Sequence, residues 1–420
     1  MKKLSFFFGI LLLCLFLFPQ EIFKEQSIVI NVEVPVRVFD GGNFVDNLSL
    51  DDFEVFEDGE LQKIVAVYQV NKKTITRKEE KKKFKPETSR NFYLFFQITE
   101  YSPRIEEALD YFIQNVLTPE DSLVVVTPMK PYSMQKNALE IKSKEEIVSQ
   151  LKGLLRKDAL MGSAEYRAAL EDLKGLTGAL ASVLASAEGV NSVSNIIGDI
   201  SSTGYKAFGE AADADDAIDI LFQMYPTVLE KLEQTRHVDQ YKLLEFARFL
   251  KEKEGQKYVF LFYQREFIPQ IDSRLLDQTL GARQDKQNIT IRISELVDMY
   301  RREVSIDIDK VKQMYADSSA SIHFMFFTKP AMHLPGIQFV EHSEDIYASF
   351  KEMAEATGGT TESSSNPGFL FKKAVESSES YYLLYYSPRE YLSDGKFKKI
   401  EVRVKGKNYR ITHRAGYFAE

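Results

Sequence analysis

Apolar and polar residues alternate along the first part of the chain, between residues 28 and 70. One face of the first run carries Val32, Val34, Val36 and Val38, and the opposite face carries Glu33, Pro35 and Arg37. Because side chains of a strand point alternately to its two faces, this spacing predicts a half-buried strand. Asp58-Gly59 separates two further runs and predicts a hairpin turn, in which both central residues need positive φ. Residues 28–70 are therefore predicted to form a small antiparallel sheet.

From residue 91 the pattern changes to strands that alternate with helices. Phe92 to Phe96 is a continuous apolar run, which is typical of a strand buried on both faces. Ser102-Pro103 predicts the start of a helix, since serine favours the cap position and proline the first turn. Apolar residues at helical spacing follow, and Leu123 to Val126 is a second buried run. This order predicts a parallel sheet covered by helices.

The same patterns continue after two irregular segments. The further predicted elements are strands at 258–263 and 322–327 and helices at 243–250, 346–356 and 370–375. Gly358-Gly359 is expected to end the second of these helices. The irregular segments, 157–235 and 270–318, are predicted to be mainly helical insertions, and residues 189–209, rich in Gly, Ser and Asn, to be a mobile part of the first.

The last part of the chain returns to strands. Tyr381–Tyr386 precedes an Asp394-Gly395 turn, and Ile400, Val402 and Val404 then alternate with charged residues. Strands at both ends of the chain suggest that the two ends build one sandwich around the middle. The tyrosines of 381–386 admit two interpretations, a carbohydrate platform or a period-two division between core and surface, and the second is favoured.

The predicted fold class is therefore α/β, with a doubly wound, mostly parallel sheet, helical insertions and a small antiparallel β-sandwich built from both chain ends. The predicted division is a signal peptide at 1–20, sandwich strands at 27–72, a basic linker at 73–90, the α/β domain at 91–378 and the remaining sandwich strands at 379–420.

The N-terminal residues predict export from the cytoplasm. Lys2 and Lys3 precede an almost wholly apolar run from Leu4 to Phe18, which suits the core of a signal peptide. An uncleaved anchor is the alternative, because Phe18-Pro19-Gln20 lacks the small residues of a cleavage site. Cys14, the only cysteine, lies within this run, so a cleaved chain is expected to have no disulfide and no cysteine-zinc site. The expected location is the periplasm, the cell envelope or the medium.

The charge of the chain narrows the classes of partner. A formal net charge of -8 over 420 residues argues against nucleic acid, which usually needs a basic face. Residues 72–85 are locally rich in lysine. We interpret them as a solvated linker, with a patch for anionic lipid or polymer as the alternative. Membrane contact is expected only through this stretch or an uncleaved signal.

Three stretches of the chain resemble the von Willebrand factor A-related proteins found in acidobacteria and related bacteria. They are Val34-Pro35-Val36-Arg37-Val38 with the run from Leu48 to Gly59, Met353 to Thr360, and Tyr382 to Pro388 leading to Tyr409–Tyr417. Together with the strand order, the resemblance covers most of residues 28–420, apart from the two insertions. It implies an A-like domain with flanking β segments that makes protein–protein contacts.

The resemblance also implies a metal site whose ligands this chain has lost. The family's domain usually binds a divalent cation through Asp-x-Ser-x-Ser after the first strand, together with a Thr and an Asp from later loops. The matching positions are Gln97, Thr99 and Tyr101, and the later carboxylate is replaced in Tyr263-Gln264-Arg265-Glu266. A hard cation needs anionic oxygen ligands, which these amides do not supply. We therefore expect no metal and no cofactor.

Other catalytic or metal-binding patterns are weak. No His-Glu-x-x-His, Gly-x-Ser-x-Gly or phosphate loop occurs, and His323 lies in a predicted buried strand. The acidic cluster of Asp213, Asp215, Asp216 and Asp219 lacks the spacing of a calcium loop and suits a helix N-terminus.

The sequence therefore predicts an exported, non-catalytic binding or scaffold protein with an unknown protein partner. Ligands of open α/β sheets usually bind beyond the carboxyl ends of the strands. The predicted binding rim is Gln97, Thr99, Glu100, Tyr101, Ser102, Gln264 and Glu266. The alternatives are a metal-dependent adhesin-like binder and, less favoured, an unrecognised hydrolase.

Overall fold

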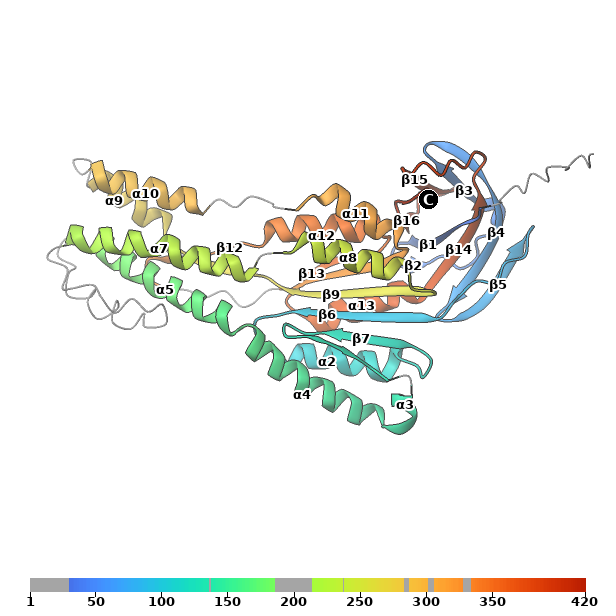
Figure 1. The fold of residues 1–420 in the computed structure, drawn as a ribbon, viewed down its shortest axis with the longest axis horizontal. Helices are drawn as coiled ribbons and strands as arrows, with labels where there is room; N and C mark the ends of the chain where they lie inside the picture. The colour runs from blue at the N-terminus through green and yellow to red at the C-terminus, as the bar shows by residue number, and fades with distance from the viewer. Residues whose placement is uncertain are drawn as a thin grey trace, which may run out of the picture.

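A computed structural model of the protein describes residues 30–135, 137–185, 214–236, 238–282, 287–300, 306–327 and 334–420. The molecule is elongated (Figure 1). A curled sheet of nine strands lies at one end, a six-stranded sheet with helices lies in the middle, and a helical projection extends from the other end. The signal segment expected at 1–20 lies outside the described residues.

The nine-stranded sheet joins the two ends of the chain. Its strands are β1 (Val32–Asp40), β2 (Asn43–Phe44), β3 (Phe53–Glu57), β4 (Glu60–Asn71), β5 (Thr74–Glu80), β14 (Ser380–Ser387), β15 (Phe397–Val404), β16 (Arg410–His413) and β17 (Gly416–Phe418). The order is β16-β1-β14-β4-β3-β15-β17, with β2 paired to β1 and β5 to β4. Every pairing is antiparallel. A short 3-10 turn, Leu50–Asp52, precedes β3.

The fold class expected from the sequence is wrong in its main feature. The largest sheet is antiparallel and curls into a half-barrel, whereas a mostly parallel doubly wound sheet with a small sandwich was expected. The reason is the position of β14, which pairs with β1 on one side and β4 on the other. Strands from both ends therefore merge into one continuous sheet. Residues 74–80, within the stretch expected to be a linker, form edge strand β5.

The tyrosines of β14 are all buried, so the expected division between core and surface is wrong. Tyr382 and Tyr386 pack in one apolar cluster with the valines of β1, and Tyr381 and Tyr385 pack in another with Tyr68. Because β14 is a central strand covered on both faces, its period of two divides the side chains between two cores. No open aromatic platform is formed by these residues.

The expected hairpin turn at Asp58-Gly59 is confirmed. It joins β3 to β4, and both residues have positive φ, 49° at Asp58 and 87° at Gly59. Asp58 also fixes the neighbouring strand, since its carboxylate accepts a 2.9 Å hydrogen bond from the Lys399 backbone N–H.

The six-stranded sheet carries the helices of the middle region. Its order is β13-β11-β9-β6-β7-β8. These strands are β6 (Arg90–Gln97), β7 (Ser122–Val126), β8 (Pro131–Ser133), β9 (Gln256–Gln264), β11 (Ala320–Phe327) and β13 (Thr361–Ser364). The sheet is mixed, because β8 runs antiparallel to β7 while the other neighbours pair in parallel. The run from Phe92 to Phe96 therefore lies in a central strand.

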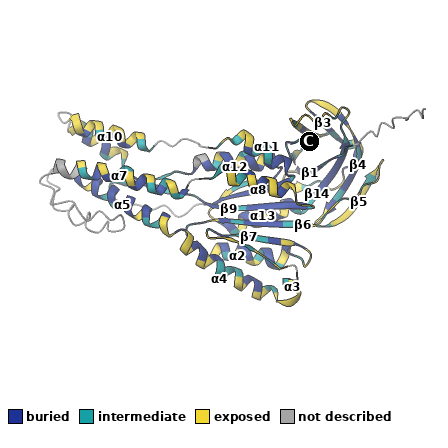
Figure 2. Cartoon of the chain, in the orientation of Figure 1, coloured by how far each residue is buried: buried dark blue, intermediate teal, exposed yellow. Residues whose placement is uncertain are grey.

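Helices cover both faces of this sheet. One face packs against α2 (Pro103–Tyr111), its extension Phe112–Val116, α4 (Lys144–Gly162) and α13 (Pro367–Glu379), with the short α3 (Ala138–Ile141) nearby. The other face packs against α8 (Gln240–Lys251), α11 (Ile308–Asp317) and α12 (Glu344–Ala356). The strands and inward helix faces are buried, and the outer helix faces are exposed (Figure 2).

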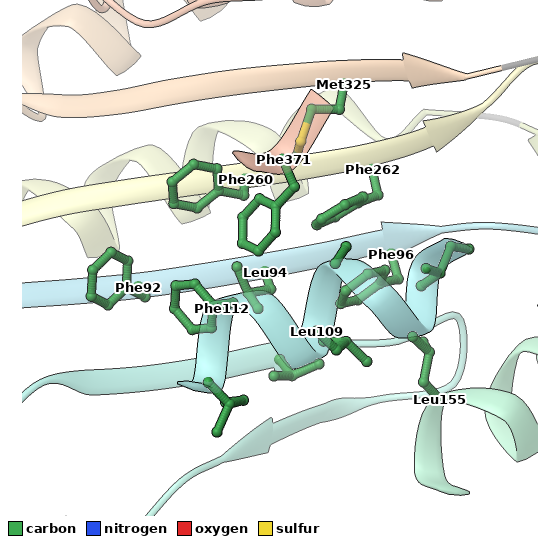
Figure 3. Packing of buried hydrophobic residues seen from close by; sticks show 14 of the residues in the cluster. Phe92, Leu94, Phe96, Leu109, Phe112, Leu155, Phe260, Phe262, Met325 and Phe371 are labelled. Carbon is green, nitrogen blue, oxygen red and sulfur yellow. The ribbon is translucent and has the colours of Figure 1, made fainter. Parts of the chain in front are cut away.

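The first of these cores is built mainly from aromatic rings. Phe260 and Phe262 of β9 contact Phe371 of α13, with ring centroids 5.0 and 5.1 Å apart, and Phe92 of β6 contacts Phe112 (Figure 3). Phe96 stacks on Phe262 with ring centroids 4.5 Å apart. The predicted start of α2 is confirmed, since Ser102 occupies the cap position and Pro103 the first helical position.

The projection has an apolar core of its own. It contains α5 (Ala164–Ala185), α7 (Ala214–Arg236), α9 (Ser273–Ala282) and α10 (Gln287–Met299), together with a ribbon of β10 (Phe267–Ile271) and β12 (Ile337–Glu341). Helices thus occupy the described parts of both predicted insertions. Asp213 and the segment 189–209 lie outside the described residues. Among the helices that the structure describes, none is both long and apolar enough to cross a bilayer.

Candidate functional site

The predicted rim residues lie where two neighbouring strands end. β6 and β9 pair in parallel, with Gln97 opposite Tyr263. The loop that follows β6 carries Thr99, Glu100, Tyr101 and Ser102, and β9 ends at Gln264, two residues before Glu266. Both segments therefore reach the same edge of the sheet, as parallel strands require.

The side-chain amide of Gln264 holds this loop. Its oxygen accepts hydrogen bonds from the Thr99 backbone N–H at 2.9 Å, the Thr99 hydroxyl at 3.1 Å and the Glu100 backbone N–H at 3.2 Å. Gln264 is buried, with 7% of its surface exposed. The amide oxygen thus occupies the space at which the Thr99 hydroxyl and the loop N–H groups converge.

Two further residues, Ser163 and Arg167, also fix this loop, and no sequence motif marks them. The Ser163 hydroxyl, between α4 and α5, lies 2.8 Å from the carbonyl oxygen of Thr99. Arg167 Nε donates to that hydroxyl at 3.1 Å, and its terminal nitrogen donates to the Leu160 carbonyl at 2.6 Å. Ser163 and Arg167 lie in the first insertion, where no motif marks them.

Glu266 is the centre of a second buried group beside the rim. Its carboxylate forms an ion pair with Arg236 of α7 and accepts a 2.8 Å hydrogen bond from the Tyr263 hydroxyl. Arg236 also donates to Glu233 at 3.0 Å and to the His342 carbonyl at 2.6 Å. Arg236 and Glu266 are 5% and 6% exposed. This network connects the projection to the rim, and no motif in the sequence marks Arg236.

The remaining rim residues divide between interior and surface. Tyr101 packs against the core under α2, and burial together with the nearby Glu106 raises its pKa to about 12. Ser102 caps α2 through its backbone conformation, without a side-chain hydrogen bond to the helix. Gln97 and Glu100 are exposed. The polar groups that the rim exposes to solvent therefore belong mainly to these two side chains.

An apolar cavity opens beside Gln97. Its volume is about 290 Å³, and its lining includes Phe95, Leu261, Leu243, Phe246 and Phe350. Gln97, Arg236 and Lys242 add polar atoms to the lining. The cavity is large enough for an apolar side chain of a partner or for a small apolar molecule.

The rim residues do not fit a divalent cation. Magnesium and calcium need several oxygen ligands with anionic charge among them. Gln264 and Gln97 are neutral, the Gln264 oxygen already accepts three hydrogen bonds, and the Glu266 carboxylate is paired with Arg236. In the part of the chain that the structure describes, no group of three or more His, Cys, Asp or Glu side chains is arranged to hold a metal.

Replacing Gln264 with leucine is expected to lower the free energy of unfolding by about 2 kcal/mol, because three donors lose a buried acceptor. Urea denaturation followed by circular dichroism measures this loss. Gln97→Leu is the matched control, since Gln97 is exposed at the adjacent strand end and should change stability by less than about 0.5 kcal/mol. Equal effects of the two substitutions would contradict the anchoring role of Gln264.

Another buried polar side chain, Lys257, lies at the opposite end of β9. It is 7% exposed, and its ammonium donates to the Lys253 carbonyl at 3.0 Å. Burial, with repulsion from Arg414, lowers the pKa of Lys257 from 10.5 to about 8. Between these pH values the unfolded chain binds more protons than the folded one, so the stability contributed by this site rises with pH. Below pH 8, where the Lys257 ammonium is charged in the folded protein, its burial lowers the free energy of unfolding by about 3 kcal/mol.

Lys257→Met is therefore expected to stabilise the protein at pH 7 by about 2 kcal/mol in low-salt buffer, because methionine removes a buried charge but also a hydrogen bond. The gain should shrink as the pH rises above 8 and be nearly gone by pH 10.5. Urea denaturation of both proteins across this range measures the difference. A gain that does not change with pH would show that the lysine is not buried as a charge.

Comparisons with known proteins do not assign the chain to a family. No family model matches the sequence, and no curated protein matches it. One similar solved structure is the human COPII-coat protein Sec24c, at 9% identity and a TM-score of 0.25. The alignment covers 80% of this chain and 44% of that one, so the chain spans less than half of that protein. A TM-score this low is not evidence of a common fold.

Proposed function

We propose that this protein is a non-catalytic binding protein that contacts a partner protein through the rim around Gln97 and Glu100, without a divalent cation. The observation that carries the proposal is the triple hydrogen bond to the Gln264 amide oxygen. This oxygen takes the place of an external ligand at the loop after β6. The loop therefore has one defined conformation before any partner arrives.

A loop that is already ordered suits the recognition of a partner. Ordering a surface before binding lowers the entropy that association costs. The exposed Gln97 and Glu100 present polar contacts, and the apolar cavity of about 290 Å³ next to Gln97 offers a space for an aromatic or aliphatic side chain. A central apolar anchor with polar contacts around it is the usual composition of a protein interface.

The proposed location of this binding is outside the cytoplasm. Its support is the sequence alone, namely Lys2 and Lys3 followed by the apolar run from Leu4 to Phe18. The relation to von Willebrand factor A-related proteins also stays a prediction from the end motifs. Neither is needed for the rim to bind a partner.

Site-specific photo-crosslinking in the native host tests the proposal. A photoreactive amino acid at Gln97 or at Glu100 is expected to give a discrete adduct of higher mass, because both positions face the proposed partner. The matched control is Leu392, which is also exposed, at 63%, and lies outside the rim. Adducts at the rim positions but not at Leu392 support the proposal, and mass spectrometry then identifies the partner. No adduct at the rim, or the same adducts at all three positions, overturns it.

A further inference from the structure

Three buried cationic side chains meet where the nine-stranded sheet contacts the six-stranded one. Arg37 comes from β1, Lys257 from the beginning of β9, and Arg414 from the turn between β16 and β17. They are 3%, 7% and 9% exposed. Arg37 lies on the polar face of β1 that the alternating sequence marks, and this face is turned toward the edge of the six-stranded sheet at which β9 begins.

The three side chains line one small cavity. Its volume of about 10 Å³ leaves room for one small occupant. Tyr258, Ser321 and Thr357 also line it. A wider opening of about 370 Å³ shares Gln256, Lys257 and Ser319 with it and leads to the surface. The cavity is therefore small, polar and reachable from solvent.

No described carboxylate is in direct contact with the positive charges in this cavity. Each cation donates a hydrogen bond to a neutral carbonyl oxygen: Arg37 to Gly358 at 3.3 Å, Lys257 to Lys253 at 3.0 Å and Arg414 to Glu33 at 2.7 Å. The Nε atoms of Arg37 and Arg414 are buried and have no hydrogen-bond partner in the described part of the chain. No described carboxylate forms an ion pair with any of the three cations within 4.0 Å.

Two carboxylates, Glu33 and Asp317, attract Lys257 and Arg414 from beyond ion-pair distance and balance their charge only in part. Glu33 accepts hydrogen bonds from the Tyr385 hydroxyl and, at 3.4 Å, from Gln256. Asp317 pairs with Lys251 at 2.8 Å and accepts a 2.9 Å hydrogen bond from the Phe418 backbone. Buried charges without a counter-charge are costly, and a bound anion would remove much of that cost.

We propose that this cavity binds one small monatomic anion, chloride under physiological conditions, held by Arg37, Lys257 and Arg414. The size of the cavity excludes phosphate and sulfate, which carry four oxygen atoms around the central atom. The site joins the two sheets, because Arg37 and Arg414 belong to one and Lys257 to the other. Chloride thus strengthens the contact between them. This inference is independent of the proposed partner-binding rim.

Thermal unfolding at constant ionic strength tests the proposal. Sodium gluconate is replaced stepwise by sodium chloride up to about 150 mM, and the melting temperature is expected to rise by about 2 °C and then level off. Sodium sulfate of the same ionic strength should give no such rise. A rise of equal size when gluconate is replaced by sulfate would overturn the proposal, because it would show a general salt effect.

Two variants locate the effect. Lys257→Met should abolish the chloride-dependent rise, whereas Lys253→Met should keep it, because Lys253 lines only the outer opening. Crystals grown in sodium bromide should show an anomalous scattering peak between Arg37, Lys257 and Arg414. Persistence of the chloride effect in Lys257→Met, or no bromide peak in the cavity, would overturn the proposal.

Discussion

Gly359→Ala is expected to lower the free energy of unfolding by at least about 3 kcal/mol, the largest effect of any single methyl group that we predict. Gly359 follows α12 and lies against β11. A Cβ atom at this position would lie 1.7 Å from the Ile322 carbonyl oxygen and 2.5 Å from its carbonyl carbon. Both are backbone atoms of a central strand, so they cannot move aside as a flexible side chain can.

The close approach at Gly359 has a structural role. Thr357 and Gly358 end α12, and Gly358 has a φ of 68°, so the predicted helix stop at Gly358-Gly359 is confirmed. Gly359 then donates to the Ala354 carbonyl at 2.9 Å, and the next carbonyl, of Thr360, accepts from Phe324 of β11 at 2.8 Å. The alanine methyl group would push this segment off β11 and break the register with β13.

Urea denaturation of Gly359→Ala, followed by circular dichroism, measures the loss. Gly153→Ala is the matched control, because Gly153 lies inside α4 and no atom lies within 4 Å of the position that its added methyl group would take. Alanine there should stabilise the helix by about 0.5 to 1 kcal/mol. A Gly359→Ala variant as stable as the native protein would contradict the close approach of Gly359 to the backbone of β11.

Arg236→Met is expected to destabilise the protein by about 3 to 5 kcal/mol, because it leaves the Glu266 carboxylate buried without its cation. The same change removes the hydrogen bonds from Arg236 to Glu233 and to the His342 carbonyl. These contacts connect α7 to the turn after β9 and to the segment before α12. The projection should therefore loosen from the middle region.

The double variant Arg236→Met with Glu266→Leu separates the charge effect from the packing effect. It should be clearly more stable than Arg236→Met alone, because no unpaired buried charge remains. Lys372→Met is the surface control, since Lys372 and Glu376 are about half exposed and should contribute less than about 0.5 kcal/mol. A double variant no more stable than the single one would show that the Arg236–Glu266 charge pair is not the source of the loss.

Local structure was largely readable from the sequence. The Asp58-Gly59 hairpin, the start of α2 at Ser102-Pro103 and the stop after α12 all depend on residues that are close in the chain. The burial of His323, which is 1% exposed, also follows from its place in an apolar run. In each case neighbouring residues determine the backbone conformation.

The arrangement of the larger sheet was not readable in the same way. The run Tyr381–Tyr386 carries no signal that it pairs with both β1 and β4. Its two faces were therefore wrongly divided between core and surface. A period of two specifies that faces differ, but not what covers each face. The fold class was wrong for this reason, because the central position of β14 merges both chain ends into one antiparallel sheet.

The candidate sites show the same limit. The sequence predicted that Thr99 and Gln264 lie at the same edge of the sheet. It did not predict that the Gln264 amide oxygen accepts hydrogen bonds from the loop. Arg236 and Ser163 come from an insertion without motifs and gave no signal. Lys257 carried one weak signal, a lysine at the start of a buried strand. Arg37 was placed on the polar face of the first strand, and Arg414 lay within a longer motif.

The metal independence of the rim is the central claim, and titration calorimetry with magnesium, manganese and calcium tests it most directly. We expect no binding with a dissociation constant below about 1 mM, for the native protein and for Thr99→Ala alike. The reason is that the Thr99 hydroxyl and the backbone N–H groups of Thr99 and Glu100 donate to Gln264, and Arg236 neutralises Glu266, so the rim lacks the several anionic oxygen ligands that a cation needs. Binding of any of these cations tighter than about 1 mM that is lost in Thr99→Ala would contradict the account.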